Sequence, residues 1–298
     1  MIDVSLLICT RNRSRSLAAT LASVEAAAGQ WSDGRIELIL VDNGSTDATA
    51  AVIRHWATDR PFIVRLLSEP LPGLARARNM ALRAARGRIV AMTDDDCVLH
   101  PDYFTRLASV FAEQPAPVII GGRILLGDPA DLTLTVKLED HPMIAEPGVF
   151  PGGFVMGANL AFSADVRRLV GPFDERFGAG APFRAAEDTD FLMRAQALGV
   201  AIRYDPGFTV DHHHGRRRED EGVALLAGYG FGDGALYAKH IGSDRRVRRW
   251  LAQDLHNLGD RFAGPVATIR HFHAFRLRHV LAGFAAYARA AIRSPRSA

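Results

Sequence analysis

The chain has 298 residues and a mass of 32.4 kDa, and its 48% hydrophobic and 23% charged residues exclude a wholly disordered or fibrous protein. Its two cysteines, Cys9 and Cys97, exclude a disulfide scaffold and a four-cysteine zinc site, and a reducing cytoplasm is the simplest location. The formal net charge is only +3, but residues 245–298 carry 11 Arg against two acids, which suggests a nearby anionic surface: a membrane, a nucleic acid or a phosphorylated lipid.

Short apolar runs alternate with helical patterns in the first part of the chain. Strands are expected over residues 4–9, 36–41, 62–67 and 88–93, and helices from about 17 and over 46–56, 73–85 and 101–111. This alternation predicts a parallel sheet that helices cover on both faces. Ligands bind such sheets outside the carboxyl ends of the strands, where we expect the loops 10–16, 42–47 and 94–101.

The pattern is looser from about residue 118 to 186, where Gly and Pro recur. We expect hairpins and irregular loops there around one more core strand, 154–162. A helix is expected over 187–198 and short strands over 201–204 and 208–210. After His214 the chain becomes basic and is expected to be helical to its end.

Three adjacent carboxylates, Asp94, Asp95 and Asp96, directly follow the strand expected over 88–93. Adjacent carboxylates repel one another, and a divalent cation such as Mg²⁺ or Mn²⁺ would neutralise them. The alternative is a solvated acidic turn that caps the next helix.

Three further sites each have a functional and a structural interpretation. Asp42 ends the second strand, where it can accept hydrogen bonds from a nucleobase or ribose or simply form an Asx-turn. Glu187 and Asp188 open a helix after the loop 177–186, either as acids that complement the helix dipole or as a general base. The histidine triplet 212–214 is either a metal ligand or a solvated loop.

Six blocks occur in a characteristic order: SLLICTRNR, LILVDNGSTDAT, GLARARNMALRAARGRIVAMTDDDCVLHPDYF, MGANLAFSADVRRLVGPFDERFG, AAEDTDFLMRAQALG and VDHHH. With these blocks the chain resembles the family 2 glycosyltransferases of the GT-A fold over about residues 3–215. The resemblance implies an α/β fold with a Rossmann-like, doubly wound, mostly parallel sheet. It also implies a GT-A catalytic domain over 1–215, with a nucleotide-sugar half over about 1–121 and an acceptor half over about 122–215. A mainly helical, basic C-terminal extension is expected over 216–298.

The same resemblance implies an inverting glycosyltransferase of the hexosyltransferase type that depends on Mn²⁺ or Mg²⁺. Its donor would be a UDP-, GDP- or dTDP-sugar, and its acceptor a hydroxyl of a saccharide or lipid-linked molecule. The expected context is synthesis of cell-surface polysaccharide, exopolysaccharide or glycolipid, with no nucleic-acid partner. Direct displacement requires no nucleophile from the enzyme.

Individual residues take their expected roles from matching positions in the family. Asp96 matches the metal-binding carboxylate of the DXD motif, and Asp94 matches the carboxylate of that motif on the ribose or metal side. His212 matches a further metal ligand, and Asp188 matches the catalytic base. The nucleotide-sugar candidates are Thr10, Arg11, Asn12, Asp42, Asn43, Arg78, Asp94 and Asp95, and the acceptor-side candidates are Glu187, Gly157 and Asn159.

Two positions depart from the family pattern. Asn43 replaces an Asp that often contacts uracil, so a UDP donor is not assured. Cys97 replaces an Asp that frequently follows the DXD motif, so that a full metal set would need His212.

Two rival functions share this scaffold. A sugar-phosphate nucleotidyltransferase is expected to carry a glycine-rich N-terminal loop, but residues 10–16 contain no glycine. A non-catalytic nucleotide-sugar-binding module is opposed by the intact Asp94, Asp96 and Asp188. A nucleic-acid-binding protein is suggested only by the basic segment, which lacks a known binding motif.

The segment 264–298 mixes aromatic and basic residues. Its apolar members are Phe272, Phe275, Leu281, Phe284 and Tyr287, among Arg270, Arg276, Arg278, Arg289, Arg293 and Arg296. In one interpretation the segment lies in an anionic headgroup layer of a membrane. In the other, its apolar side chains pack on the catalytic domain and its arginine side chains face water. The start of the chain does not resemble a signal peptide and no apolar run is long enough to span a bilayer, so we expect a cytoplasmic protein or one peripheral to the inner membrane face.

Overall fold

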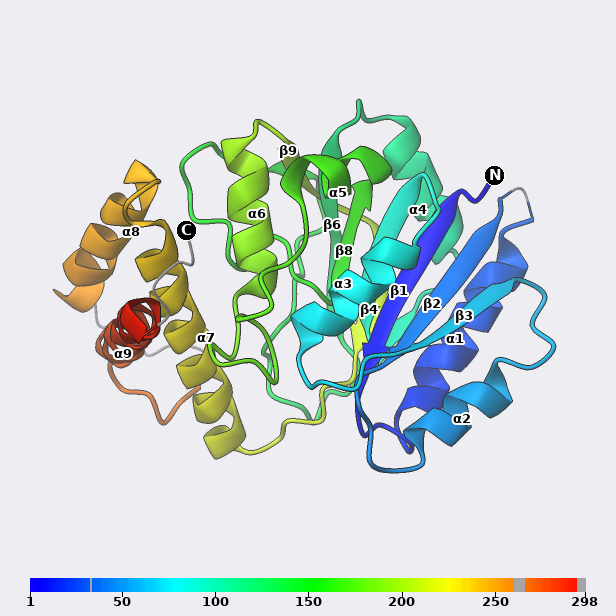
Figure 1. Ribbon diagram of the computed structural model, residues 1–298, viewed down its shortest axis with the longest axis horizontal. Coiled ribbons are helices and arrows are strands. Elements are labelled where there is room, and N and C mark those ends of the chain that lie inside the picture. Colours follow the sequence, from blue (N-terminus) through cyan, green and yellow to red (C-terminus); the bar gives the residue numbers. More distant parts are fainter. Residues whose placement is uncertain (33, 260–265, 294–298) are drawn as a thin grey trace.

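The computed structural model describes residues 1–32, 34–259 and 266–293 (Figure 1). The strands are β1 (Val4–Thr10), β2 (Ile36–Asp42), β3 (Ile63–Ser68), β4 (Ile89–Asp94), β5 (Cys97–Leu99), β6 (Val118–Leu126), β7 (Met143–Ile144), β8 (Asn159–Ser163) and β9 (Ala201–His212). They form one mixed sheet in the order β3-β2-β1-β4-β8-β6-β9-β5, and β7 pairs with β9. The strands β1, β2, β3 and β4 are parallel to one another, as expected.

Helices cover both faces of this sheet. They are α1 (Leu17–Gln30), α2 (Thr49–Trp56), α3 (Leu74–Ala84), α4 (Tyr103–Ala112), α5 (Ala164–Val170) and α6 (Glu187–Ala197). Leu6 and Ile8 of β1 pack in one core with α1, α2 and α4, whereas Leu7 packs in the other core with α3, α5 and α6. Because both faces are buried, β1 and β2 are apolar along nearly their whole length.

The structure differs from expectation between residues 118 and 212. Residues 118–126 form the nine-residue strand β6, and 201–212 form one strand instead of two. The two strands are parallel, and their register shifts between Gly121 and Arg123. A Cβ at Gly122 would lie 2.5 Å from the carbonyl oxygen of Phe208. Here glycine permits close strand contact at an irregularity, whereas in the sequence it suggested a loop.

Three smaller expectations were also wrong. The core strand expected over 154–162 is limited to β8, which is antiparallel to both β4 and β6. The helix α5 was not expected. The helix α2 begins at Thr49 instead of 46, and the carboxylate of Asp47 accepts the N–H of Thr49.

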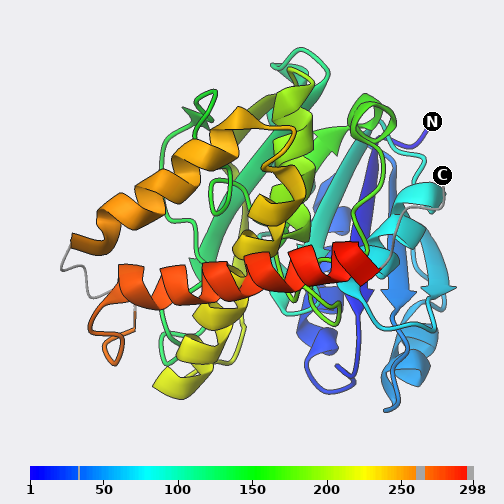
Figure 2. The ribbon, with the colours of Figure 1, turned by 60° about the vertical axis from the view of Figure 1, so that its left-hand side comes forward.

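The expected helical extension is present as α7 (Glu219–His240), α8 (Arg245–His256), the 3₁₀ turn η1 (Asn257–Gly259) and α9 (Phe272–Arg293). Figure 2 shows α9 lying across α7. Within the ranges that the structure describes, no helix is both long and apolar enough to cross a bilayer. The domain boundaries at residues 121 and 215 stay predictions.

Most of the aromatic residues considered for a membrane face pack inside the protein. Phe284 and Tyr287 belong to an apolar cluster with Leu236 of α7, and Phe272 and Phe275 belong to another. Of this set, Leu281 is exposed. Residues 264, 265 and 294–298, including Arg296, lie outside the described residues. Packing accounts for these aromatic side chains, and contact with a membrane stays a prediction.

Candidate functional site

A cavity of about 830 Å³ opens at the carboxyl ends of β1, β2 and β4. The start of α6, the end of β9 and the helices α7 and α9 complete its wall. The sequence-predicted residues that line it are Thr10, Arg11, Asn43, Arg78, Asp94, Asp95, Asp96, Gly157, Glu187, Asp188 and His212.

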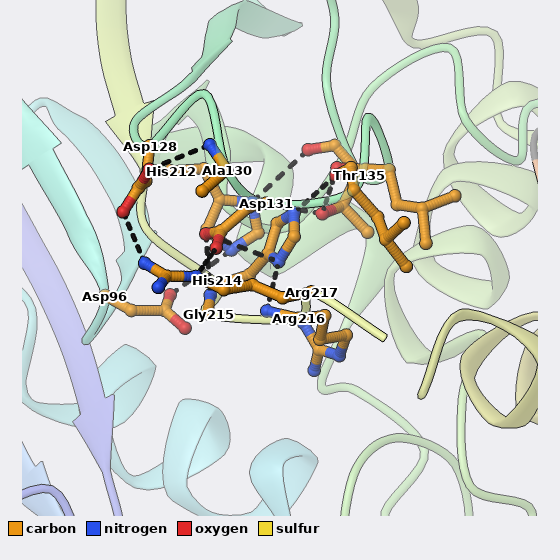
Figure 3. A network of polar contacts seen from close by, with 12 residues as sticks. Asp96, Asp128, Ala130, Asp131, Thr135, His212, His214, Gly215, Arg216 and Arg217 are labelled. Atoms are coloured by element: carbon orange, nitrogen blue, oxygen red, sulfur yellow. Dashed lines mark hydrogen bonds and ion pairs between the residues drawn. The ribbon is translucent and has the colours of Figure 1, made fainter. Parts of the chain in front are cut away.

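Asp96 and His212 form a buried pair on this wall (Figure 3). The Nε2 atom of His212 lies 3.3 Å from Oδ1 of Asp96. Its Nδ1 lies 3.3 Å from the carbonyl oxygen of Thr135, which can only accept, so the imidazole proton belongs on Nδ1. Burial disfavours both charged forms, yet the hydrogen bond and attraction between the two groups, together with the charge of Arg13, lower the pKa of Asp96. The same contact with Asp96, together with the charge of Asp94, raises the pKa of His212.

The acidic triplet is not a solvated turn. Asp95 and Asp96 are only 8% and 9% exposed. Arg13 lies 3.4 Å from Asp95 and 3.5 Å from Asp96. Burial raises the pKa of Asp95 to about 6 and also raises that of Asp94. Carboxylates that are held together against this desolvation cost form a site suited to a cation.

The donor set fits a divalent cation with oxygen and nitrogen ligands. Asp96 supplies an oxygen, and His212 is oriented by a carbonyl on its other nitrogen, as metal-binding histidines usually are. The thiol of Cys97 lies within 4.8 Å of both ligand atoms. Burial raises the pKa of Cys97 well above its usual value, and a thiol is a poor ligand for Mg²⁺ or Mn²⁺, which prefer oxygen ligands.

Arg78 of α3 connects β4 to α6. Its Nη2 donates to Asp94 over 3.1 Å and its Nη1 donates to Glu187 over 2.8 Å. Burial disfavours the guanidinium charge, but Glu187, Asp94 and Asp188 raise the pKa of Arg78 overall. A Cβ at Gly157 would lie 2.5 Å from the guanidinium, so only glycine leaves room for it.

Glu187 and Asp188 occupy different environments although they are adjacent. Glu187 is buried against Arg78, and burial together with the Asp188 charge raises its pKa. Asp188 is half-buried and lines the cavity, and its carboxylate accepts the N–H groups of Gly157, over 3.0 Å, and Thr189, over 2.7 Å. These two bonds orient a carboxylate that remains accessible from the cavity.

Three predicted residues do not line the cavity. The Asn12 side chain accepts from the N–H of Thr46, and Asp42 accepts from the N–H of Ser45, three residues on, in the turn after β2. Asn159 is fully buried and is hydrogen-bonded to Tyr103, Arg123 and Phe208.

Asn43 does line the cavity, but its amide also has a structural role. The side chain donates to the carbonyls of Glu69 and Leu71 and accepts the N–H of Gly73. An aspartate could not donate these two bonds, which gives the departure from the family pattern a local cause.

The basic run after His214 divides into paired and unpaired arginines. Arg217 pairs with Asp131 over 3.1 Å and also with Asp128, and Arg218 pairs with Asp220 (Figure 3 shows the first network). Arg216 lines the cavity and, among the described residues, forms no ion pair. Its charge contributes to the lowered pKa of Asp96.

Sequence reasoning missed several wall residues: Arg13, Thr135, Arg216, Tyr229, Asp233 and Arg276. Arg13 lies in the expected ligand-binding loop 10–16, which was the available signal. No local pattern distinguished Tyr229, Asp233 or Arg276, because each reaches the cavity only through the packing of α7 and α9.

Comparison with known proteins shows what this chain is similar to. Residues 5–145 match the model for glycosyl transferase family 2. The chain is 24% identical over 202 residues to the glycosyltransferase AglE of Haloferax volcanii, covering 67% of this chain and 64% of that protein. It is 26% identical over 207 residues to the succinoglycan biosynthesis protein ExoM of Rhizobium meliloti, covering 69% and 65%. The chain spans from 28% to 65% of the length of the first three curated relatives that it matches.

The fold is that of solved glycosyltransferases. The mannosyltransferase PcManGT from Pyrobaculum calidifontis, in complex with GDP-Man and Mn²⁺, superposes with a TM-score of 0.58 at 20% identity, covering 98% of this chain and 76% of that one. The expected GT-A architecture is therefore confirmed.

Proposed function

We propose that this chain, whose residues 5–145 match the model for glycosyl transferase family 2, transfers a sugar from a nucleotide diphospho-sugar to an acceptor hydroxyl with inversion at the anomeric carbon. One observation carries the proposal. The buried Asp96–His212 pair, suited to a cation, and the accessible carboxylate of Asp188 line the same cavity. The first suits a diphosphate leaving group and the second an attacking hydroxyl.

At the donor end, Asp96 and His212 would hold Mn²⁺ or Mg²⁺, with Asp94 on the ribose or metal side. The bound cation supplies charge stabilisation to the departing diphosphate. Thr10, Arg11, Asn43 and Asp95 line the space for the nucleotide, and UDP, GDP and dTDP remain the donor classes. PcManGT, which has the same fold, is known with GDP-Man and Mn²⁺, which supports a metal-bound nucleotide sugar.

At the acceptor end, Asp188 acts as the general base. The acceptor oxygen forms a bond to the anomeric carbon, the bond from that carbon to the diphosphate breaks, and the hydroxyl proton goes to Asp188. Glu187 suits this role less well, because Arg78 holds its carboxylate at 2.8 Å. Gly157 contributes its N–H to Asp188 instead of contacting the acceptor itself.

Arg216 binds the departing diphosphate in this scheme. It is the arginine of its run that lines the cavity without a carboxylate partner among the described residues. We expect Arg216→Ala to weaken binding of the nucleoside diphosphate by roughly 10- to 100-fold, since hydrogen bonds to charged groups contribute ~1.5–3 kcal/mol. Titration calorimetry with UDP and GDP in Mn²⁺ measures this.

The matched control is Arg218→Ala. Arg218 lies two positions after Arg216 and carries the same charge, but its side chain is already paired with Asp220. Equal affinities for the two variants would mean that Arg216 acts only through the general field of the site.

The acceptor is proposed to be a saccharide or a lipid-linked saccharide, in polysaccharide or glycolipid synthesis. The name of the relative ExoM, a succinoglycan biosynthesis protein, supports that context. A cytoplasmic site of action and attachment of the basic C-terminal extension to anionic membrane are further parts of the proposal. The division at residue 215 into a catalytic domain and this extension is likewise proposed.

A panel of UDP-, GDP- and dTDP-sugars tests the proposed function. Each donor is incubated with the protein with Mn²⁺ or with chelator, and release of nucleoside diphosphate and protection against thermal unfolding are measured. We expect metal-dependent release with one donor class. Protection without release would favour the non-catalytic binding module, and formation of nucleoside triphosphate in a parallel incubation with added pyrophosphate would favour a nucleotidyltransferase. No response to any donor would reject the proposal.

A further inference from the structure

One face of α7 lines the cavity on the side formed by the C-terminal helices. Leu225, Tyr229 and Asp233 all line it, and because they are four residues apart they lie on one face of the helix. The helix α9 adds Phe272 and Phe275 to this wall. The wall therefore combines aromatic rings with the carboxylate of Asp233 and the guanidinium of Arg276.

Backbone contact between α7 and α9 holds this wall in place. A Cβ at Gly234 would lie 1.9 Å from the carbonyl oxygen of Val280, and one at Gly283 would lie 1.9 Å from that of Phe231. Two helices that meet at glycines on both sides have little freedom to slide past each other. Figure 2 shows this crossing, and Phe272 and Phe275 of α9 pack in one apolar cluster with Leu225 and Leu226 of α7.

Asp233 keeps one carboxylate oxygen available. Its Oδ2 accepts from Arg276 over 2.8 Å, whereas its Oδ1 has no hydrogen-bond partner among the described residues. Arg276 also pairs with Asp254, at 2.5 Å, so the three side chains together carry one net negative charge when both acids are ionised. Burial raises the pKa of Asp233 to about 6, which leaves it ionised at neutral pH.

Asp233 and Tyr229 are both electrostatic neighbours of the proposed base. Besides burial, the charge of Asp188 contributes to the raised pKa of each of them. Tyr229 is 41% exposed, so its ring still has accessible surface. Asp188, Tyr229 and Asp233 line the same cavity, so a molecule that presents a hydroxyl to Asp188 would occupy the space that Tyr229 and Asp233 also border.

We propose that Tyr229 and Asp233 form the acceptor subsite, and that it takes an uncharged sugar unit. This inference rests on the proposed transfer of a sugar to a hydroxyl. A carboxylate oxygen accepts hydrogen bonds from sugar hydroxyls, and the rings of Tyr229, Phe272 and Phe275 offer apolar surface to the C–H face of a sugar ring. The net negative charge of the Asp233–Arg276–Asp254 group disfavours a phosphate or carboxylate on the accepting sugar. The cavity is near the upper end of the ~300–1,000 Å³ usual for small-molecule sites, which leaves room for an acceptor beside the donor.

The test uses the full chain with Mn²⁺ and the donor selected by the panel above. The probes are p-nitrophenyl glucosides, galactosides and mannosides, with the corresponding 6-phosphates and uronides, and the readout is stimulated release of nucleoside diphosphate. We expect an uncharged glycoside to stimulate release, and its half-saturating concentration to rise at least tenfold in Asp233→Asn and in Tyr229→Ala.

The matched control is Asp254→Asn, which removes the other carboxylate partner of Arg276 and does not line the cavity. This variant should leave the half-saturating concentration of the glycoside within twofold of the wild-type value. Asp254→Asn should also keep the glycoside-independent release of the wild type, and circular dichroism checks that all three variants are folded. An unchanged response in Asp233→Asn, preferential stimulation by the charged glycosides, or no stimulation by any glycoside would overturn the inference. If the wild type neither binds nor hydrolyses any donor, it is the proposed function that fails.

Discussion

Replacing Asp188 by asparagine is expected to slow sugar transfer by roughly 10²–10⁴-fold, the usual contribution of a general base, while donor binding changes by only a few-fold. The carboxylate accepts two backbone N–H groups, from Gly157 and Thr189, and an amide of the same shape can keep one of these bonds. The amide cannot take the proton of the attacking hydroxyl. Single-turnover transfer and donor titration, measured on the same preparation, separate the two effects.

A surface acid in the same helical position provides the control. Asp220 is the second residue of α7, as Asp188 is of α6, and it lies in the first turn, where it complements the helix dipole. Asp220→Asn should therefore leave transfer unchanged. Transfer by Asp188→Asn at nearly the wild-type rate would assign the base elsewhere, with Glu187 the next residue to test.

Replacing Asp96 by alanine is expected to abolish the part of nucleotide-sugar affinity that depends on Mn²⁺ or Mg²⁺. Loss of residues that merely support a metal ligand costs ~10–100-fold in metal affinity, so loss of a ligand should cost at least as much. Asp96 also pairs with His212 and with the positive charge of Arg13, and its removal leaves both side chains without this carboxylate. Calorimetry with donor, with and without the metal, measures the change, and circular dichroism checks that the fold is intact.

Asp211→Ala is the matched control for this variant. Asp211 precedes His212 on β9, but its carboxylate is 34% exposed and pairs with His100. Unchanged metal-dependent affinity in Asp96→Ala would mean that the DXD interpretation is wrong, and equal losses in both variants would point to disruption of β9.

Much of the nucleotide half was readable from the sequence, because its signals are local. The apolar strands β1, β2 and β4 and the loops that follow them are contiguous segments, and the parallel arrangement places those loops at one edge of the sheet. Asp94, Asp95 and Asp96 reach the cavity because they lie at the end of β4. The start of α6 at Glu187 was also predictable, because its signal lies in a contiguous segment of the sequence.

The tertiary structure decided which side chains meet and which are already occupied. Arg78 and Glu187 are 109 positions apart and form a 2.8 Å hydrogen bond, whereas Asn12 and Asn159, predicted for ligands, hold loops and strands together. The glycines of β6 suggested a loop, although close strand contact requires them there. Asp233 reaches the cavity through the crossing of α7 and α9, which depends on backbone contact between segments more than 40 residues apart. Local sequence cannot encode that proximity, since it follows from the burial of apolar side chains from the entire chain at once.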